Sequence, residues 1–275
     1  INYSKLEASN LVDIDVSYLE GGGQILRMST AFSVLTGKAI SVKHIRAGRK
    51  DGGLKAQHLT GIQLLGELSD AKLDGDHLKS SQLTFAPGQL KHGQFNADTH
   101  TAGSICLLIQ SALPCLAFAR EPCELTLKGG TNAENAPQVD YFLLLLKPLL
   151  DEKFGYNMEC EVIKRGYFPK GGGHVHLRTQ PVDRLRAIDL TEFGQLKSIY
   201  IRAFVAGYLP VKIAQTMADT ARVELLKICG RDVDITMDVV AEPNTNHIGT
   251  GTGLIVVAKT STGLSLIHIS QGIVR

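Results

Sequence analysis

The sequence lacks three features that would each point to a particular class of protein. Its five cysteines form no CxxC pair and no spacing typical of a zinc site, so we expect reduced thiols in a cytosolic or nuclear protein. The formal net charge is only +2, so no overall basic field indicates nucleic-acid binding, and any site for a polyanion must be local. The most apolar window, residues 104–119, is too short to cross a bilayer and contains Gln110 and Pro114.

What is present indicates a globular protein with an ample core. Hydrophobic residues make up 44% of the 275 residues and charged residues 20%, which is typical of a soluble fold. This length is enough for one large domain or two ordinary ones.

An internal repeat organises the first 180 residues. Alternating and helical periodicities predict the order strand, helix, strand, helix and late strands twice, over about 12–92 and about 93–180. Gly22 and Gly103 lie 81 residues apart, as do Gly48 and Gly129, which favours a duplicated βαβαββ unit. Such a unit is one sheet backed by two helices. The expected helices are 24–36, 54–68, 104–119 and about 137–153.

The pattern changes after Pro181. The periodicity predicts strands over 198–208, 233–240 and 253–261 and an amphipathic helix over 211–229. The glycine-rich turns that separate the earlier elements are missing from this part of the sequence. We therefore predict an α/β (α+β) protein in which residues 1–182 form a large domain of repeated units. A smaller α/β domain spans 183–263, and 264–275 is an atypical tail.

Two glycine loops could carry chemistry. The stretch "EGGGQILR" (20–27) leads from a strand into a helix, and such turns bring backbone N–H groups close to an anion. It lacks the Walker lysine and the GxGxxG spacing, so a plain tight turn is the alternative. The second stretch, "RGYFPKGGG" (165–173), has three successive glycines, which favours a close backbone approach that a side chain would obstruct.

Polar residues gather on the same predicted edge, because successive loops of an α/β repeat emerge together. Guanidinium groups suit bidentate phosphate contact, and a carboxylate among them is a natural ligand for Mg²⁺ that bridges phosphates. A solvated charged rim is the alternative. The candidates are the carboxylate Glu20 and the polar side chains of Arg27, Arg46, Arg49, Lys50, Lys55, Gln57 and His58.

Five stretches in order resemble the RNA 3′-terminal phosphate cyclase family, over about residues 13–263. The resemblance implies a large domain of three repeated units with a small inserted α/β domain. It also implies a ligase that uses ATP to adenylate a histidine, passes AMP to an RNA 3′-phosphate, and forms a 2′,3′-cyclic phosphate in RNA processing. The stretches are "EGGGQILR", "IRAGR", "QHLTG", "KGGTNAENAPQVDY" and "RGYFPKGGG".

Residue by residue, the resemblance assigns the site as follows. Glu20 matches a catalytic, metal-associated carboxylate for Mg²⁺ or Mn²⁺, and Gln110 and Pro137 match contacts to the ATP nucleotide, with Pro137 on the adenine. The family's polar residues around the phosphates, which we include among the catalytic residues, match Arg27, Arg46, Arg49, Gln57 and His58. RNA 3′-phosphate ends are the expected partner, and the nucleus or the cytoplasm is the expected location. We expect no membrane association, and the sequence indicates no stable protein partner.

The last residues depart from the family pattern. "LSLIHISQGIVR" (264–275) does not match the family segment that carries the nucleophilic histidine, so His268 is not assigned and the 275 residues as written are expected to form no covalent AMP. Two alternatives stay open: a non-catalytic paralogue that binds RNA in ribosome biogenesis, and an enolpyruvyl transferase of similar units. The RGxxPxGGG stretch argues against the second alternative.

Overall fold

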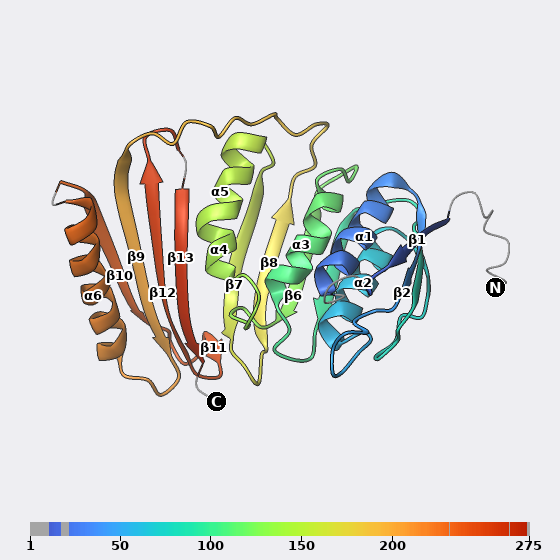
Figure 1. Ribbon diagram of the computed structural model, residues 1–275, viewed down its shortest axis with the longest axis horizontal. Helices are drawn as coiled ribbons and strands as arrows, with labels where there is room; N and C mark the ends of the chain where they lie inside the picture. The colour runs from blue at the N-terminus through green and yellow to red at the C-terminus, as the bar shows by residue number, and fades with distance from the viewer. Residues whose placement is uncertain (1–10, 18–21, 231, 264, 274–275) are drawn as a thin grey trace.

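Three mixed sheets follow one another in chain order in the computed structural model, which describes residues 11–17, 22–230, 232–263 and 265–273 (Figure 1). Helices α1, α2 and α3 lie between the first and second sheets, and α6 covers the far side of the third (Figure 1). The chain is thus a mixed α/β protein, as its periodicities predict.

The first sheet is built from alternating strands and two helices. Ile40 and Val42 of β2 are buried while Ser41 and Lys43 are more accessible, and the sheet packs against α1. Helix α1 begins after Gly22 and ends at Gly37, whose φ of +68° is easily adopted only without a side chain. The elements are β1 (Leu11–Asp15), α1 (Gly23–Thr36), β2 (Ala39–Lys43), α2 (Ala56–Leu68), β3 (Lys72–Asp74) and β4 (Leu83–Ala86).

The second sheet repeats this arrangement. Its strand order β5-β6-β8-β7 corresponds to β1-β2-β4-β3 in the first sheet, with the first pair parallel and the others antiparallel in both. This shared topology agrees with the predicted βαβαββ duplication. The elements are β5 (Gly93–Asp98), α3 (Ile105–Leu116), β6 (Cys123–Gly129), β7 (Met158–Gly166) and β8 (Gly173–Thr179).

The helix between β6 and β7 alternates α and π turns. It runs as α4 (Val139–Tyr141), η2 (Phe142–Leu146), α5 (Lys147–Leu149) and η3 (Leu150–Phe154), and it ends at Gly155 with φ +73°. The sequence predicted one helix here without the π turns. None of the helices in the described ranges is both long and apolar enough to cross a membrane.

The third sheet has a different order, β10-β9-β12-β13. Residues 265–273, interpreted from sequence as an atypical tail, form strand β13 and pair antiparallel with β12. The elements are β9 (Leu196–Ala206), α6 (Val211–Cys229), β10 (Asp234–Ala241), β12 (Gly251–Thr260) and β13 (Ser265–Ile273). The short strand β11 (His247–Ile248) joins the edge of the second sheet beside β7.

Three apolar clusters of the described residues hold these layers together, one of them between α6 and the third sheet. One apolar cluster is shared by the first two sheets and their helices, and includes Val42, Leu65, Leu108 and Leu127. A smaller cluster joins the second and third sheets, where the Tyr167 and Phe204 rings lie 6.3 Å apart. The third sheet therefore packs against the end of β7.

Candidate functional site

Three helix N-termini meet at one corner of the molecule. A side chain on Gly23, at the start of α1, would overlap His58 Nε2 in the first turn of α2. Gln57 of α2 accepts a hydrogen bond at 2.8 Å from the backbone N–H of Ser104, the N-cap of α3. The predicted convergence of these loops is present, and the positive ends of three helix dipoles favour an anion at this corner.

Gln57 connects α2 to the N-terminus of α3 at the corner. Its Oε1 atom is taken by the Ser104 N–H, so this oxygen is engaged in holding α2 against α3. The phosphate role assigned to Gln57 by resemblance is therefore open only to its amide nitrogen. Gln57 is in either case a residue that sets the spacing between two helix N-termini.

Arg27 connects the corner to the middle of α3. Its Nε donates to Gln110 Oε1 at 3.1 Å and its Nη2 donates to Gln24 Oε1 at 2.9 Å. Burial lowers the pKa of Arg27 from its ordinary value, but a guanidinium remains charged at neutral pH. Two residues assigned separately by sequence, Arg27 and Gln110, are thus hydrogen-bonded to each other.

Arg46 and Arg49 lie on the loop between β2 and α2. Arg46 has φ +54° and its Nη1 donates to the carbonyl oxygens of Asp51 (2.7 Å) and Gly53 (3.0 Å), so part of its guanidinium fixes its own loop. Arg49 lies exposed on that loop. The charge of Arg46 acts on His58, which places Arg46 close to the corner.

His58 is a neutral hydrogen-bond donor. The Lys55 N–H donates to His58 Nδ1 at 3.3 Å, so the single proton of the neutral ring is on Nε2, beside Gly23. Burial, followed by the positive charges of Arg46, Arg27 and Lys55, lowers the pKa of His58 to about 4. The ring therefore presents an N–H to the corner at neutral pH without adding charge.

The lowered pKa of His58 predicts a pH dependence of stability. The unfolded chain binds a proton on this ring below about pH 6.5 and the folded chain only near pH 4, so the free energy of unfolding should rise with pH between these values. Replacing His58 with glutamine should remove this part of the slope, measured by urea unfolding at pH 4.5 and pH 7. His100→Gln, which changes an exposed ring, is the control, and an unchanged slope in His58→Gln would contradict the assignment.

An apolar groove of about 580 Å³ opens beside the corner, between α1, α3 and the helix from Val139 to Phe154. Gln110 and Pro137, assigned by resemblance to one ligand, both line it, and Tyr141 lies next to them. Burial raises the pKa of Cys106, which also lines the groove, so this thiol is not a ready nucleophile. Apolar walls with one amide suit a flat, weakly polar group.

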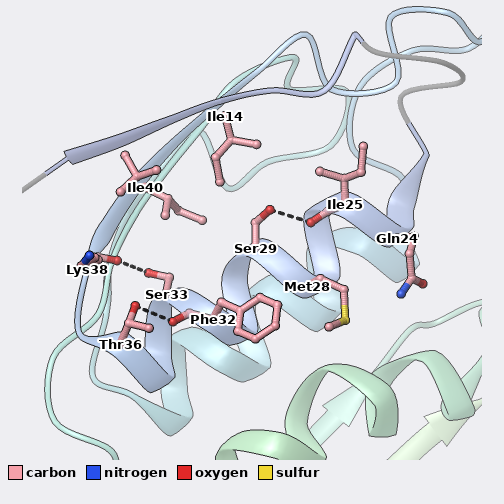
Figure 2. Close-up of a pocket in the computed structure, with 11 residues that line it drawn as sticks. Ile14, Gln24, Ile25, Met28, Ser29, Phe32, Ser33, Thr36, Lys38 and Ile40 are labelled. Atoms are coloured by element: carbon pink, nitrogen blue, oxygen red, sulfur yellow. Dashed lines mark hydrogen bonds between the residues drawn. The ribbon is translucent and has the colours of Figure 1, made fainter.

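A second groove lies between β1 and the outer side of α1 (Figure 2). Ile14, Ile25, Phe32 and Ile40 line it, and the hydroxyl of Ser29 is already bonded to the Ile25 carbonyl at 2.7 Å. The described residues that line this groove include no acid–base pair, so we assign it no chemistry. Phe32 on this side of α1 is 55% exposed, while Leu26 and Ala31 are among the residues of the helix that are buried.

The glycines of "RGYFPKGGG" pack against the chain itself. A side chain on Gly171 would overlap the Thr101 carbonyl oxygen, and one on Gly166 would lie 2.6 Å from the Gly129 carbonyl oxygen. Gly171 also has φ +65°. The close approach expected from three glycines is therefore to the loops after β5 and β6, and it holds the N-terminus of α3 in place.

A buried ion network was not expected from the sequence. Arg165 of β7 pairs with Asp140 of α4 and with Glu242 after β10, and Arg202 of β9 pairs with Glu242 and Asp238. Sequence reasoning gave Arg165 no role beyond its place in the signature stretch. The available signal was only that Asp140 and Arg165 each lie inside one of the quoted motifs.

The metal assignment cannot be followed to its residue. Glu20 lies outside the described residues, and within the ranges that the structure describes no three His, Cys, Asp or Glu side chains gather as metal ligands. The described side chains of the corner are cationic or neutral, and this donor set does not fit a divalent ion. The roles of Glu20 and of Mg²⁺ or Mn²⁺ stay predictions.

The comparisons with known proteins agree with the motifs. A family model described as RNA 3′-terminal phosphate cyclase matches residues 18–264. A protein of that name from Pyrobaculum aerophilum is 40% identical over 252 residues, covering 92% of this chain and 70% of the relative. The Drosophila melanogaster protein is 37% identical over 261 residues, covering 95% and 72%. A probable RNA 3′-terminal phosphate cyclase of Dictyostelium discoideum is 40% identical over 255 residues, covering 91% and 58%.

Proposed function

The chain belongs to the RNA 3′-terminal phosphate cyclase family, and on this premise we propose that it serves the ATP-dependent conversion of an RNA 3′-terminal phosphate to a 2′,3′-cyclic phosphate. The observation that carries the proposal is the Arg27–Gln110 hydrogen bond, which joins an anion-binding corner to an apolar groove. A nucleotide needs both: a groove for its base and a cationic corner for its phosphates.

The reaction assigned by family membership has three transfers. A histidine attacks the α-phosphorus of ATP and releases pyrophosphate, the RNA 3′-phosphate takes the AMP group from that histidine, and the RNA 2′-hydroxyl attacks the activated phosphorus and releases AMP. Each step moves negative charge among phosphate oxygens, so fixed donors are the main requirement on the protein. The nucleophilic histidine is not assigned in this chain.

The described residues supply the fixed donors and the base site. Backbone N–H groups at the starts of α1, α2 and α3 face the corner, with the guanidinium of Arg27 and the Nε2–H of His58 between them. A neutral His58 donates to a phosphate oxygen without competing for its proton. Pro137 and Tyr141 would flank the adenine, and Glu20 would associate with a divalent ion.

Binding measurements test the proposal directly. The chain should bind ATP, and it should bind a 3′-phosphorylated oligoribonucleotide more tightly than the 3′-hydroxyl form, measured by fluorescence anisotropy at fixed salt. No ATP binding, or equal binding of the two RNA ends, would reject it. RNA binding that ignores ATP and the terminal phosphate is the result expected of a non-catalytic RNA-binding paralogue.

Arg27→Lys should weaken ATP binding about tenfold, because an ammonium group cannot hold Gln24 and Gln110 and still present a fork to phosphate. Titration calorimetry measures the effect. Lys72→Arg, an exchange in the opposite sense on exposed strand β3, is the control and should leave binding unchanged. Full affinity in Arg27→Lys would show that this guanidinium acts only as a point charge.

A further inference from the structure

One wall of the apolar groove is held from behind by a buried ion pair. Asp140 follows Pro137 by three residues and precedes Tyr141, and both of these neighbours line the groove. The two carboxylate oxygens of Asp140 accept hydrogen bonds from Nη1 and Nη2 of Arg165, each at 2.7 Å. The side chains are only 4% and 8% exposed, so this contact is made away from the groove and from water.

The third sheet holds Arg165 in this orientation. Its Nε donates to Glu242 Oε1 at 2.9 Å, and its guanidinium carbon lies 5.3 Å from the centre of the Phe204 ring. Glu242 is itself held by Arg202 Nη2 at 3.1 Å. Each of the three guanidinium nitrogens therefore bonds a carboxylate, and the two carboxylates belong to different layers of the fold.

A second set of bonds ties the same wall to the end of β7. Gly166 N donates to Thr131 Oγ1 at 3.1 Å, and Val139 N donates to the Thr131 carbonyl at 2.9 Å. Asn132 Nδ2 donates to Gln138 Oε1 at 2.8 Å. The stretch before α4 can thus move only with the end of β7, while Asp140 sets how α4 itself is turned.

We propose that Arg165 is a positioning residue for the groove, through which Glu242 of the third sheet fixes the Pro137–Tyr141 wall against a bound adenine base. This rests on the proposed function, because it takes an adenine nucleotide as the occupant of the groove. The third sheet, which lines none of the corner, would then set affinity for the base and not for the phosphates.

The chemistry of the network favours positioning over a contribution to stability alone. A buried ion pair often stabilises a fold no better than apolar residues of similar volume, but its bidentate geometry fixes direction. Arg165 has one carboxylate on the wall and one on the third sheet, so the position of Asp140 depends on both. Aliphatic side chains in place of these charges would bury the same area without fixing the angle of α4.

The test uses the whole 275-residue chain with ATP and inorganic tripolyphosphate as probes. Glu242→Gln should weaken ATP binding about tenfold and leave tripolyphosphate binding within about twofold. Asp140→Asn should act in the same direction, and the effect of Glu242→Gln should be lost in the Asp140→Asn background because both act through Arg165. Asp238→Asn is the matched control, since Asp238 pairs with Arg202 but does not contact Arg165.

Amide hydrogen exchange gives a readout that does not need a nucleotide. In Glu242→Gln the amides of Val139 and Tyr141, bonded to the Thr131 and Gln138 carbonyls, should exchange faster, and in Asp238→Asn they should not. If wild type binds no ATP, the proposed function fails and this exchange alone decides the role of Arg165. Equal loss of both probes, the same effect in Asp238→Asn, or unchanged exchange would overturn the proposal.

Discussion

Replacing Arg165 with methionine should lower the free energy of unfolding by about 3–5 kcal/mol, because it leaves the Asp140 carboxylate buried without its partner. Asp140 is 4% exposed, and its other cation, Arg202 Nε, lies 3.8 Å from Oδ1, too far for a hydrogen bond. Glu242 would also lose its contact with Arg165. Urea unfolding followed by circular dichroism measures the change.

Arg178→Met is the matched control for this experiment. Arg178 on β8 also contacts a carboxylate, Glu124, at 2.7 Å, but its side chain is 45% exposed. Water replaces the lost partner at such a site, so the urea midpoint should hardly move. A similar loss in both variants would mean that burial does not determine what these pairs contribute.

Replacing Gly171 with alanine should destabilise the fold by about 3 kcal/mol or more. The new methyl group would overlap the Thr101 carbonyl oxygen, and overpacking of this kind typically costs about 1–3 kcal/mol. The positive φ of +65° adds a penalty of about 1–2 kcal/mol for any residue with a Cβ. The shift should appear in the thermal midpoint and in the urea midpoint.

Gly37→Ala separates the two causes. Gly37 has nearly the same φ, +68°, but no atom lies within 4 Å of where its methyl group would be. It should therefore show the conformational penalty alone, about 1 kcal/mol. If the two alanine variants unfold at the same midpoint, the approach of Gly171 to Thr101 is not tight in solution.

The shared strand order of the first two sheets and the meeting of their loops at one corner could be predicted because their signals are local. Glycines at equal offsets mark loops of equal position, and loops of an α/β repeat emerge at one edge, which is how Gly23, His58 and Ser104 come together. The apolar groove was implied only by resemblance, through Gln110 and Pro137. Nothing in the spacing of those two residues shows that three helices enclose them.

The ion network could not be predicted because its members are joined only by tertiary packing. Asp140 and Arg165 lie 25 residues apart and Arg202 and Asp238 lie 36 residues apart, on elements whose pairing no local periodicity specifies. Arg46 shows the converse case. The sequence placed its charge among the candidate phosphate contacts, which stays a prediction, but its bonds to Asp51 and Gly53 depend on a left-handed backbone that sequence does not reveal in a non-glycine residue.

The π turns of the helix after Pro137 account for the straight wall that this helix gives to the groove. Phe142, Leu146, Leu150 and Phe154 all line it, at intervals of four residues. In an α-helix of 3.6 residues per turn, each such step would rotate the side chain by about 40°, so the last of the four would have drifted about 120° from the first. The wider turns η2 and η3, closed by i→i+5 bonds, absorb that rotation. The four-residue spacing of these apolar side chains thus keeps them on one face of the helix because the helix contains turns wider than α.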